Sequence, residues 1–191
     1  HSFEGKWKVI VYYPKDFTFV CPTEILAYDK LNKDFADRDA VLLIGSTDNE
    51  FVKLAWKNAH EGLRNTTCWM FADTKREIDW DDESSSLVTQ LGVFSNAAGA
   101  ALRATFIVDP DNVIRSVNFY PMQVGRNMNE VIRLVEALQT TTEAKVITPA
   151  NWQKGDDVMV PYYPYTKAQL EANPELKDEY YSMGNRMWFK K

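Results

Sequence analysis

The sequence predicts an α/β domain, with a mixed central sheet flanked by helices, followed by an extended C-terminal tail. Apolar, β-branched runs alternate with amphipathic stretches, and two later runs face each other across a Pro-Asp-Asn turn. From Thr141, prolines and aromatic residues replace this pattern. We expect a domain over residues 1–140 and an extension over 141–191 that packs on the domain or on a partner subunit. Because the chain starts at His1 and enters a strand pattern at once, we also expect N-terminal strands of the gene product to precede it.

Three strands of the sheet follow from short apolar runs. Trp7–Tyr13 and Ala40–Ser46 are nearly continuous in apolar residues, which is typical of strands covered on both faces, and Cys68–Ala72 is a shorter run of the same kind. The stretches between them, Pro22–Ala36 and Asn49–Gly62, carry apolar residues at helical spacing. Strands joined through helices are expected to be parallel, with right-handed crossovers.

The second of these helices has the clearest expected boundaries. Asp48 is the predicted N-cap and Gly62 the stop. Phe51, Leu54 and Ala55 fall on one side and form the predicted apolar face.

The second half of the domain is expected to complete the sheet with a hairpin. Residues 75–92 are predicted to form a helix interrupted by the acidic run DWDDESSS, and Leu102–Asp109 and Val113–Phe119 to form two antiparallel strands. Met128–Leu138 is predicted to be an amphipathic helix, and the tail to contain one more at Lys167–Tyr181. This order of elements is that of a thioredoxin-like fold, which by itself does not define a function.

Composition narrows the classes of function. The chain carries 22 Lys and Arg against 27 Asp and Glu, a net charge of −5, which argues against nucleic acid as the main partner. No apolar run is long enough to cross a bilayer and no secretory signal is present, so no membrane partner is expected. Two cysteines are too few for a disulfide scaffold, which favours a cytoplasmic protein with a possible reactive thiol.

The candidate chemistry is concentrated around Cys21. The segment Pro14–Glu24, PKDFTFVCPTE, leaves the carboxyl end of the first strand and enters the first helix, and ligands bind at this edge of an open α/β sheet. A thiol in the first turn of a helix lies among free backbone N–H groups at the positive end of the helix dipole, and both favour the thiolate. From position alone, the alternative is a small buried hydrophobic residue.

Several motifs favour a reactive thiol at Cys21, because they resemble those of a known protein family. Pro14-x-x-x-Thr18-x-x-Cys21 and the longer FTFVCPTE resemble the signature of peroxiredoxins of the alkyl hydroperoxide reductase C type. The resemblance covers about residues 7–155 and includes further landmarks in the same order: Trp56, Arg103 within LRATFIVDP, residues 124–139, and PANW at 149–152. It implies an antioxidant thiol peroxidase that reduces hydrogen peroxide and organic hydroperoxides without a cofactor.

The resemblance also implies roles for four residues. Cys21 is expected to attack a peroxide oxygen and become a sulfenic acid. Arg103, always cationic, is expected to stabilise the thiolate and the departing oxygen. Thr18, one turn before Cys21, is expected to hydrogen-bond the thiolate and the substrate, and Pro14 to cover the site against water.

A second group of residues is expected farther from the sulfur. Glu24 and Arg126 match family positions that order the outer part of the pocket, although a surface or interface ion pair is an equal alternative for Arg126. Trp56 is expected in the pocket wall or in the core. His1 and His60 are expected to be solvated, and neither zinc-ligand spacing nor a phosphate-binding Gly-rich loop is present, so no metal or cofactor is expected.

The chain departs from the typical two-cysteine pattern at Thr148. Such peroxiredoxins carry a resolving cysteine just before PANW, supplied to the partner subunit, and Thr148 occupies that place. Three interpretations stay open: a one-cysteine cycle with an external thiol or disulfide reductase as electron donor, resolution by Cys68, or a structural or sensing role with weak turnover. Because strand cysteines are usually buried and inert, core packing is the preferred role of Cys68.

Two other classes of function compete with the peroxidase. Members of the family commonly form homodimers that assemble into rings, so a ring-forming holdase, scaffold or redox sensor is the alternative, with the aromatic tail as contact surface. A thiol–disulfide oxidoreductase normally uses Cys-x-x-Cys, whereas this site reads CPTE. Peroxide consumption that depends on Cys21 separates the peroxidase from both.

Overall fold

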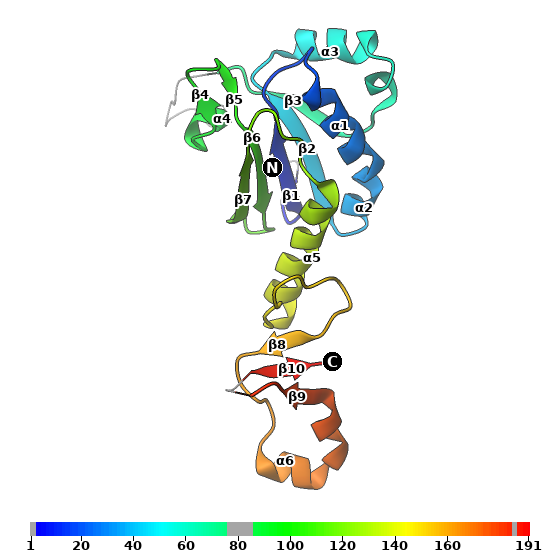
Figure 1. Cartoon of the computed structure of the whole chain (residues 1–191), viewed down its shortest axis with the longest axis vertical. Coiled ribbons are helices and arrows are strands. Elements are labelled where there is room, and N and C mark those ends of the chain that lie inside the picture. Colours follow the sequence, from blue (N-terminus) through cyan, green and yellow to red (C-terminus); the bar gives the residue numbers. More distant parts are fainter. Residues whose placement is uncertain (1–2, 76–85, 185–186) are drawn as a thin grey trace. The chain divides into compact units, whose positions relative to one another are not determined.

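The structure, a computed structural model, describes residues 3–75, 86–184 and 187–191, and it divides into two compact units, His1–Met128 and Asn129–Lys191. The first unit is built on a five-stranded sheet of β1 (Trp7–Tyr12), β2 (Ala40–Ser46), β3 (Trp69–Ala72), β6 (Arg103–Val108) and β7 (Ile114–Tyr120). The strand order is β3-β2-β1-β6-β7 (Figure 1). Strands β1, β2 and β3 are parallel, whereas β6 runs antiparallel to both β1 and β7. The predicted mixed sheet is confirmed.

Helices connect the parallel strands. The connections contain α1 (Val20–Lys30) and α2 (Asn32–Ala36) between β1 and β2, and α3 (Glu50–Ala59) with the 3-10 turn η1 (Leu63–Asn65) between β2 and β3. The prediction of one continuous helix over residues 22–36 is wrong at Leu31, whose φ of −100° and ψ of 7° leave the helical region. The N-cap of α3 is Asn49 rather than Asp48, because the Asn49 side chain accepts the Val52 N–H.

The buried side of α3 also differs from the prediction. Phe51 and Leu54 are 73% and 58% exposed, whereas Lys53 and Trp56 are buried. The ring centroid of Trp56 lies 6.1 Å from that of Tyr13, at the end of β1. The large Trp56 ring therefore determines which side of α3 faces the protein interior. The predicted apolar face, with Phe51 and Leu54, is left exposed to solvent.

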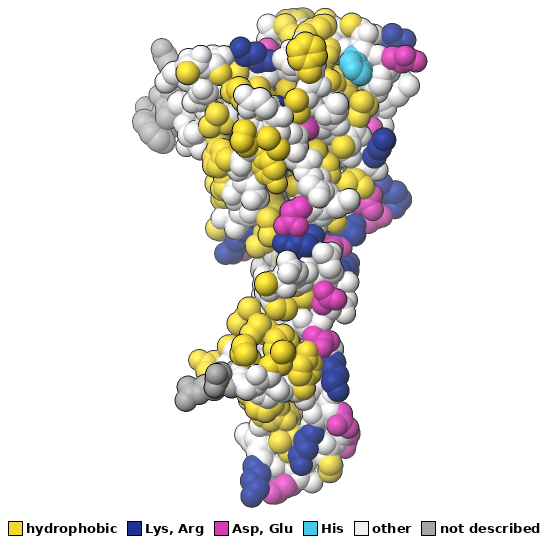
Figure 2. All heavy atoms as spheres, viewed as in Figure 1, with side chains coloured by type: hydrophobic (Ala, Val, Ile, Leu, Met, Phe, Trp, Pro, Cys, Tyr) yellow, Lys and Arg dark blue, Asp and Glu magenta, His cyan; other side chains and the backbone are white. Residues whose placement is uncertain are grey.

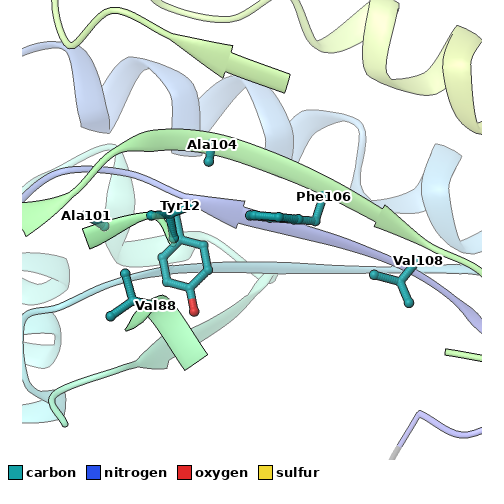
Figure 3. Packing of buried hydrophobic residues seen from close by; sticks show 7 residues of the cluster. Tyr12, Val88, Ala101, Ala104, Phe106 and Val108 are labelled. Atoms are coloured by element: carbon teal, nitrogen blue, oxygen red, sulfur yellow. The ribbon is translucent and has the colours of Figure 1, made fainter. Parts of the chain in front are cut away.

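One face of the sheet carries a hydrophobic cluster. Tyr12 and Phe106 pack there with Val88, and the two rings meet edge-on at 6.5 Å (Figure 3). The elements on this face are α4 (Leu87–Gln90), β4 (Phe94–Ser95) and β5 (Ala100–Ala101). Most of the helix predicted over 75–92 falls on residues 76–85, which lie outside the described part of the chain.

The opposite face carries polar side chains of β6. Neighbouring residues of a strand point to opposite faces, so Arg103 and Thr105 lie opposite to Ala104 and Phe106. The hydroxyl of Tyr28 in α1 lies 3.5 Å from Thr105 Oγ1. Helix α1 therefore covers the face from which Arg103 projects.

The second unit is folded rather than extended. It contains the greater part of α5 (Met128–Ala144), then α6 (Lys167–Ala172), the 3-10 helix η2 (Pro174–Glu179) and a sheet of β8 (Val158–Val160), β10 (Trp188–Lys190) and β9 (Tyr180–Ser182). The single helix predicted over 167–181 is therefore wrong: α6 ends before Pro174, which has no N–H to continue it. The predicted domain boundary at residue 140 lies within α5, and the docking of the extension on the domain or a partner stays a prediction.

Aromatic side chains hold this small sheet together. The rings of Tyr163 and Trp188 are 4.4 Å apart between centroids, and Tyr181 stacks on Phe189 at 5.2 Å. Beyond Trp152, none of the described residues is buried. The extension is thus stabilised by half-exposed ring contacts rather than by an enclosed core.

Candidate active site

Cys21 lies in the first turn of α1, which confirms the predicted position. Helix α1 begins at Val20, so Cys21 is its second residue and Pro22 its third. Pro22 is accommodated because the N–H groups of a first turn have no helical acceptor. Phe19 caps the helix without a side-chain hydrogen bond, and the first turn contains no acidic residue. Backbone N–H groups and the positive end of the dipole therefore remain available to favour a thiolate.

Cys21 lies in the wall of a cavity of about 650 Å³. Cys21, Pro14, Thr18 and Arg103 all line it, so the four residues assigned to the reaction are brought together. Cys21 is only 2% exposed, which means that reactants reach it through this cavity. The walls also include residues that no motif marked: Lys15, Phe19, Val20, Ala97, Ala98, Met122 and Gln123.

Arg103 places its guanidinium beside the sulfur. Its Nη1 lies 3.9 Å from Cys21 Sγ, and the residue is 2% exposed. Nη2 donates to the Met122 carbonyl at 2.5 Å, which fixes the plane of the group. A buried, permanently charged group at this distance stabilises negative charge on the sulfur.

Thr18 lies just before α1, ahead of Cys21 as expected. Its hydroxyl donates to the Lys15 carbonyl at 2.8 Å. The hydroxyl hydrogen is thus used by the backbone, and the oxygen lone pairs are what Thr18 offers to the cavity.

Glu24 joins the two arginines behind the cavity. Its carboxylate accepts from Arg126 Nε at 2.9 Å, Nη2 at 2.8 Å and backbone N at 2.8 Å, and also from Arg103 Nη1. Arg126 further donates to the Ala104 carbonyl at 2.9 Å and to Thr105 Oγ1 at 3.0 Å. Burial alone would raise the pKa of Glu24, but the hydrogen bonds and charges of the arginines hold it below its usual range. The surface alternative for Arg126 is wrong, because the residue is buried.

Trp56 lies in the core behind the site. It is 3% exposed, its ring centroid lies 6.0 Å from that of Phe17, and it does not line the cavity. Of the two positions expected from the sequence, core or pocket wall, the structure shows the core.

Lys53 is a buried cation near the site that no motif marked. Its Nζ donates to Ser46 Oγ at 2.6 Å, to the Tyr13 hydroxyl at 3.0 Å and to Asp16 Oδ1 at 3.4 Å. Burial lowers the pKa of Lys53, and the neighbouring negative charges, that of Asp16 first, oppose this shift. A lysine on a helix normally reaches solvent; the one available signal was its i, i+3 spacing from Trp56, which places both on one side of α3.

Cys68 lies at the amino end of β3, away from the carboxyl edge of the sheet where Cys21 is found. It immediately precedes β3, whereas Cys21 follows the carboxyl end of β1. Strand β3 alone spans about 13 Å, and a disulfide tolerates about 7 Å between Cα atoms. Burial, and then the charge of Asp29, raise the pKa of Cys68 to about 12. These properties describe a core thiol held apart from Cys21.

The position of the absent resolving cysteine falls in the second unit. Thr148 is half-buried and follows Ile147, which forms an isolated antiparallel bridge with Met159. Nearby, Trp152 of the PANW motif is buried and donates its indole N–H to the Asp156 carbonyl at 3.0 Å. After Cys68 the chain contains no further cysteine, so this unit has no sulfur that could form a disulfide.

Residues 3–75, 86–184 and 187–191 contain no group of three or more His, Cys, Asp or Glu side chains that could hold a metal ion. No helix in the same ranges combines the length and apolar character needed to cross a membrane. His60, expected to be solvated, is half-buried and its Nδ1 accepts the Leu63 N–H at 3.3 Å.

Known proteins resemble both units of the chain. Residues 1–117 match the AhpC/TSA family, and residues 137–171 match the C-terminal domain of 1-Cys peroxiredoxin. An alkyl hydroperoxide reductase C of Mycolicibacterium smegmatis is 49% identical over 155 residues, which are 81% of this chain and 72% of the relative.

Solved structures extend the resemblance to the fold. Mycobacterium tuberculosis AhpC is 45% identical with a TM-score of 0.64, and 74% of each chain is covered. A yeast mitochondrial 1-Cys peroxiredoxin, described with a thiol resolving mechanism via glutathione/thioredoxin systems, is 29% identical with a TM-score of 0.76. That comparison covers 100% of this chain and 88% of the yeast protein.

Proposed function

Because this chain belongs to the AhpC/TSA family of peroxiredoxins and is a thiol-dependent peroxidase with the thioredoxin-like fold, we propose that it runs a one-cysteine cycle. In this cycle Cys21 alone carries the oxidised sulfur, and an external thiol reduces it. The observation that carries the proposal is that Cys21 lines the cavity and its sulfur lies beside a buried arginine, whereas Cys68 lies just before the amino end of β3.

In the first step, the Cys21 thiolate attacks the terminal oxygen of the hydroperoxide. The S–O bond forms as the O–O bond breaks, which gives a sulfenic acid on Cys21 and an alkoxide or hydroxide that takes up a proton and leaves as alcohol or water. Arg103, with Nη1 at 3.9 Å from the sulfur, stabilises the thiolate first and then the departing oxygen. Thr18 accepts a hydrogen bond from the O–H of the peroxide, because its own hydrogen is donated to Lys15.

Three further residues support this step. Pro14 lines the cavity and limits the access of water to the sulfur. Glu24 and Arg126 keep the guanidinium of Arg103 in place, since the Glu24 carboxylate bonds to both arginines. They are positioning residues rather than participants in bond breaking.

The second half of the cycle needs a thiol from outside the chain. An external thiol attacks the sulfenic sulfur and releases water to give a mixed disulfide; a second thiol then displaces Cys21 as the reduced thiolate. Thr148 supports this assignment because its hydroxyl cannot form a disulfide. The yeast 1-Cys relative, described with glutathione/thioredoxin systems, makes a thioredoxin-type or glutathione-type reductant the expected donor.

We further infer that the enzyme works as a homodimer that assembles into a ring. Strand β7 is an edge of the sheet, and its exposed residues include Ile114, Val117 and Phe119, at 44%, 42% and 54% exposure. Figure 2 shows hydrophobic side chains gathered on the surface around β6 and β7. An apolar sheet edge of this kind favours pairing with another copy. We also propose that the enzyme has an antioxidant role in the cytoplasm.

The cycle is tested by mass spectrometry after one equivalent of hydrogen peroxide. A sulfenic acid on Cys21, trapped with a sulfenic-specific reagent, is expected in the wild type, and Cys21→Ser should consume no peroxide while keeping its fold. Cys68→Ala serves as the matched control and should retain the wild-type rate. A Cys21–Cys68 disulfide would overturn the one-cysteine cycle, and equal peroxide decay in wild type and Cys21→Ser would exclude Cys21 as the reacting thiol.

A further inference from the structure

The loop that brings Pro14 and Thr18 to the cavity is held in place by residues that do not line the cavity. This loop, residues 13–19 and named here the Pro14 loop, connects β1 to α1. The Asp16 N–H donates to Asp48 Oδ2 at 2.9 Å. Phe17 has a φ of 53°, in the left-handed region that non-glycine residues rarely adopt. A loop with such a residue keeps its shape only where its surroundings enforce it.

Lys53 of α3 holds the loop in this shape through hydrogen bonds from one buried atom, Nζ. Its Nζ donates to the Tyr13 hydroxyl at 3.0 Å and to Asp16 Oδ1 at 3.4 Å, so it binds two points of the Pro14 loop at once. Its third hydrogen bond, at 2.6 Å, goes to Ser46 Oγ at the end of β2. The Tyr13 hydroxyl also donates to Asp16 Oδ1 at 2.7 Å, which closes the group. The loop is thus tied to both α3 and β2.

The hydrogen-bonded cluster around Lys53 also depends on the charge of Lys53. The Asp16 side chain is 1% exposed, and its Oδ2 has no hydrogen-bond partner among the described residues. An unpaired buried carboxylate is costly, so the Lys53 ammonium is what makes the buried position of Asp16 tolerable. None of the hydrogen-bonded residues of this cluster lines the cavity; they are Tyr13, Asp16, Ser46, Asp48 and Lys53.

We propose that Lys53 is a positioning residue of the peroxide site, holding the Pro14 loop closed over Cys21. The inference rests on the peroxidase cycle proposed above. The charged and titratable groups that face Lys53 are Asp16, Asp48, Tyr13 and Cys21. Burial lowers the pKa of Lys53, and the charges of Asp16, Asp48 and Cys21 counteract it.

The test replaces Lys53 by methionine, which keeps most of the volume and removes the charge. The second-order rate constant for hydrogen peroxide, measured by stopped-flow fluorescence, should fall about tenfold or more, because the positions of Pro14 and Thr18 are affected. The rate of Cys21 alkylation by iodoacetamide should rise at the same time, because a displaced Pro14 loop exposes a sulfur-bearing residue that is 2% exposed in the wild type. Lys57→Met is the matched control: Lys57 is a half-buried lysine on the same helix, but its Nζ donates to the Thr66 carbonyl, and less than a twofold effect is expected.

A double variant keeps the test decisive where Lys53→Met leaves Asp16 unpaired. Lys53→Met with Asp16→Asn removes both charges, so its thermal unfolding should return toward that of the wild type while its peroxide rate stays about tenfold low. A wild-type peroxide rate in the double variant, an unchanged rate of Cys21 alkylation in Lys53→Met, or equal peroxide rates for Lys53→Met and Lys57→Met would overturn the proposal. Failure of both Lys53 variants to fold would assign Lys53 to stability alone and overturn it as well. A wild type without peroxidase activity would instead contradict the proposed cycle.

Discussion

Glu24→Gln tests how the site is held together. The Glu24 carboxylate is 2% exposed and is shared by Arg103 and Arg126, so solvent screens these ion pairs very little. Glutamine removes the charge and presents an NH₂ group to guanidinium donors. Breaking a buried pair by removing one partner costs about 3–5 kcal/mol, a large part of the roughly 5–15 kcal/mol that stabilises an ordinary domain. We expect a loss of this size, and a peroxide rate at least about tenfold lower because Arg103 loses its support.

The effect of Glu24→Gln should depend on pH with a defined sign. In the folded chain the pKa of Glu24 is held below its usual range, against the opposing effect of burial. A carboxyl of this kind stabilises the fold above its unfolded-state pKa, and that contribution is lost as the pH falls through the folded-state pKa. The variant lacks the contribution at every pH. The difference in unfolding free energy between wild type and variant should therefore be largest at neutral pH and shrink in acid.

Urea unfolding followed by tryptophan fluorescence, at neutral and acidic pH, measures this difference. Asp37→Asn is the control in the same unit: Asp37 pairs with Lys33 at 2.6 Å on the surface of the short helix α2. Such an exposed i, i+4 pair contributes about 0.2–0.5 kcal/mol. A cost of Glu24→Gln below about 1 kcal/mol, or a cost that does not change with pH, would refute the view that Glu24 balances two buried arginines.

Three other predictions address the fold. Gly45→Ala should destabilise the chain by about 1–3 kcal/mol in thermal unfolding, because a Cβ at Gly45 would lie 2.4 Å from ring atoms of Phe71; an unchanged melting temperature would contradict this close packing. Cys68→Ala, which empties a buried site, should lower the unfolding free energy by about 1–2 kcal/mol without slowing peroxide consumption; a slower rate would link Cys68 to the cycle. Phe189→Ala should remove the stack on Tyr181, cost about 1 kcal/mol and speed limited proteolysis within the second unit; equal proteolysis would show that the stack does not hold this sheet together.

The sequence predicted those parts of the fold that depend on local pattern. Nearly uninterrupted apolar runs identified β1 and β2, because a strand covered on both faces has no polar side to alternate with. The position of Cys21 in a first helical turn followed from a strand that ends near Pro14 and from Pro22, which is best tolerated there. The four residues that line the cavity with assigned roles were found through their shared motifs and not through periodicity.

What the sequence could not predict depends on competition between distant groups. Helical spacing continues through Leu31, yet the chain leaves the helical region there and resumes it in α2. Helix α3 has two sides that could have been buried. Trp56 packs against Tyr13 and Phe17, and the side with Phe51 and Leu54 is therefore left exposed. The burial of Lys53 depends on acceptors from other elements, among them Asp16, which is 37 residues away in the chain. No local pattern contains that information.

The number of charges around Cys21 explains why the site needs two arginines. A single Glu24–Arg103 pair would cancel the charge of the guanidinium that faces the sulfur. Arg126 instead supplies three of the hydrogen bonds to Glu24, two from its side chain and one from its backbone, whereas Arg103 shares one nitrogen with the carboxylate and the sulfur. Two guanidinium groups and one carboxylate leave a net charge of about +1 beside the thiolate. The buried carboxylate thus fixes the geometry of Arg103 without removing the positive charge that the reaction requires.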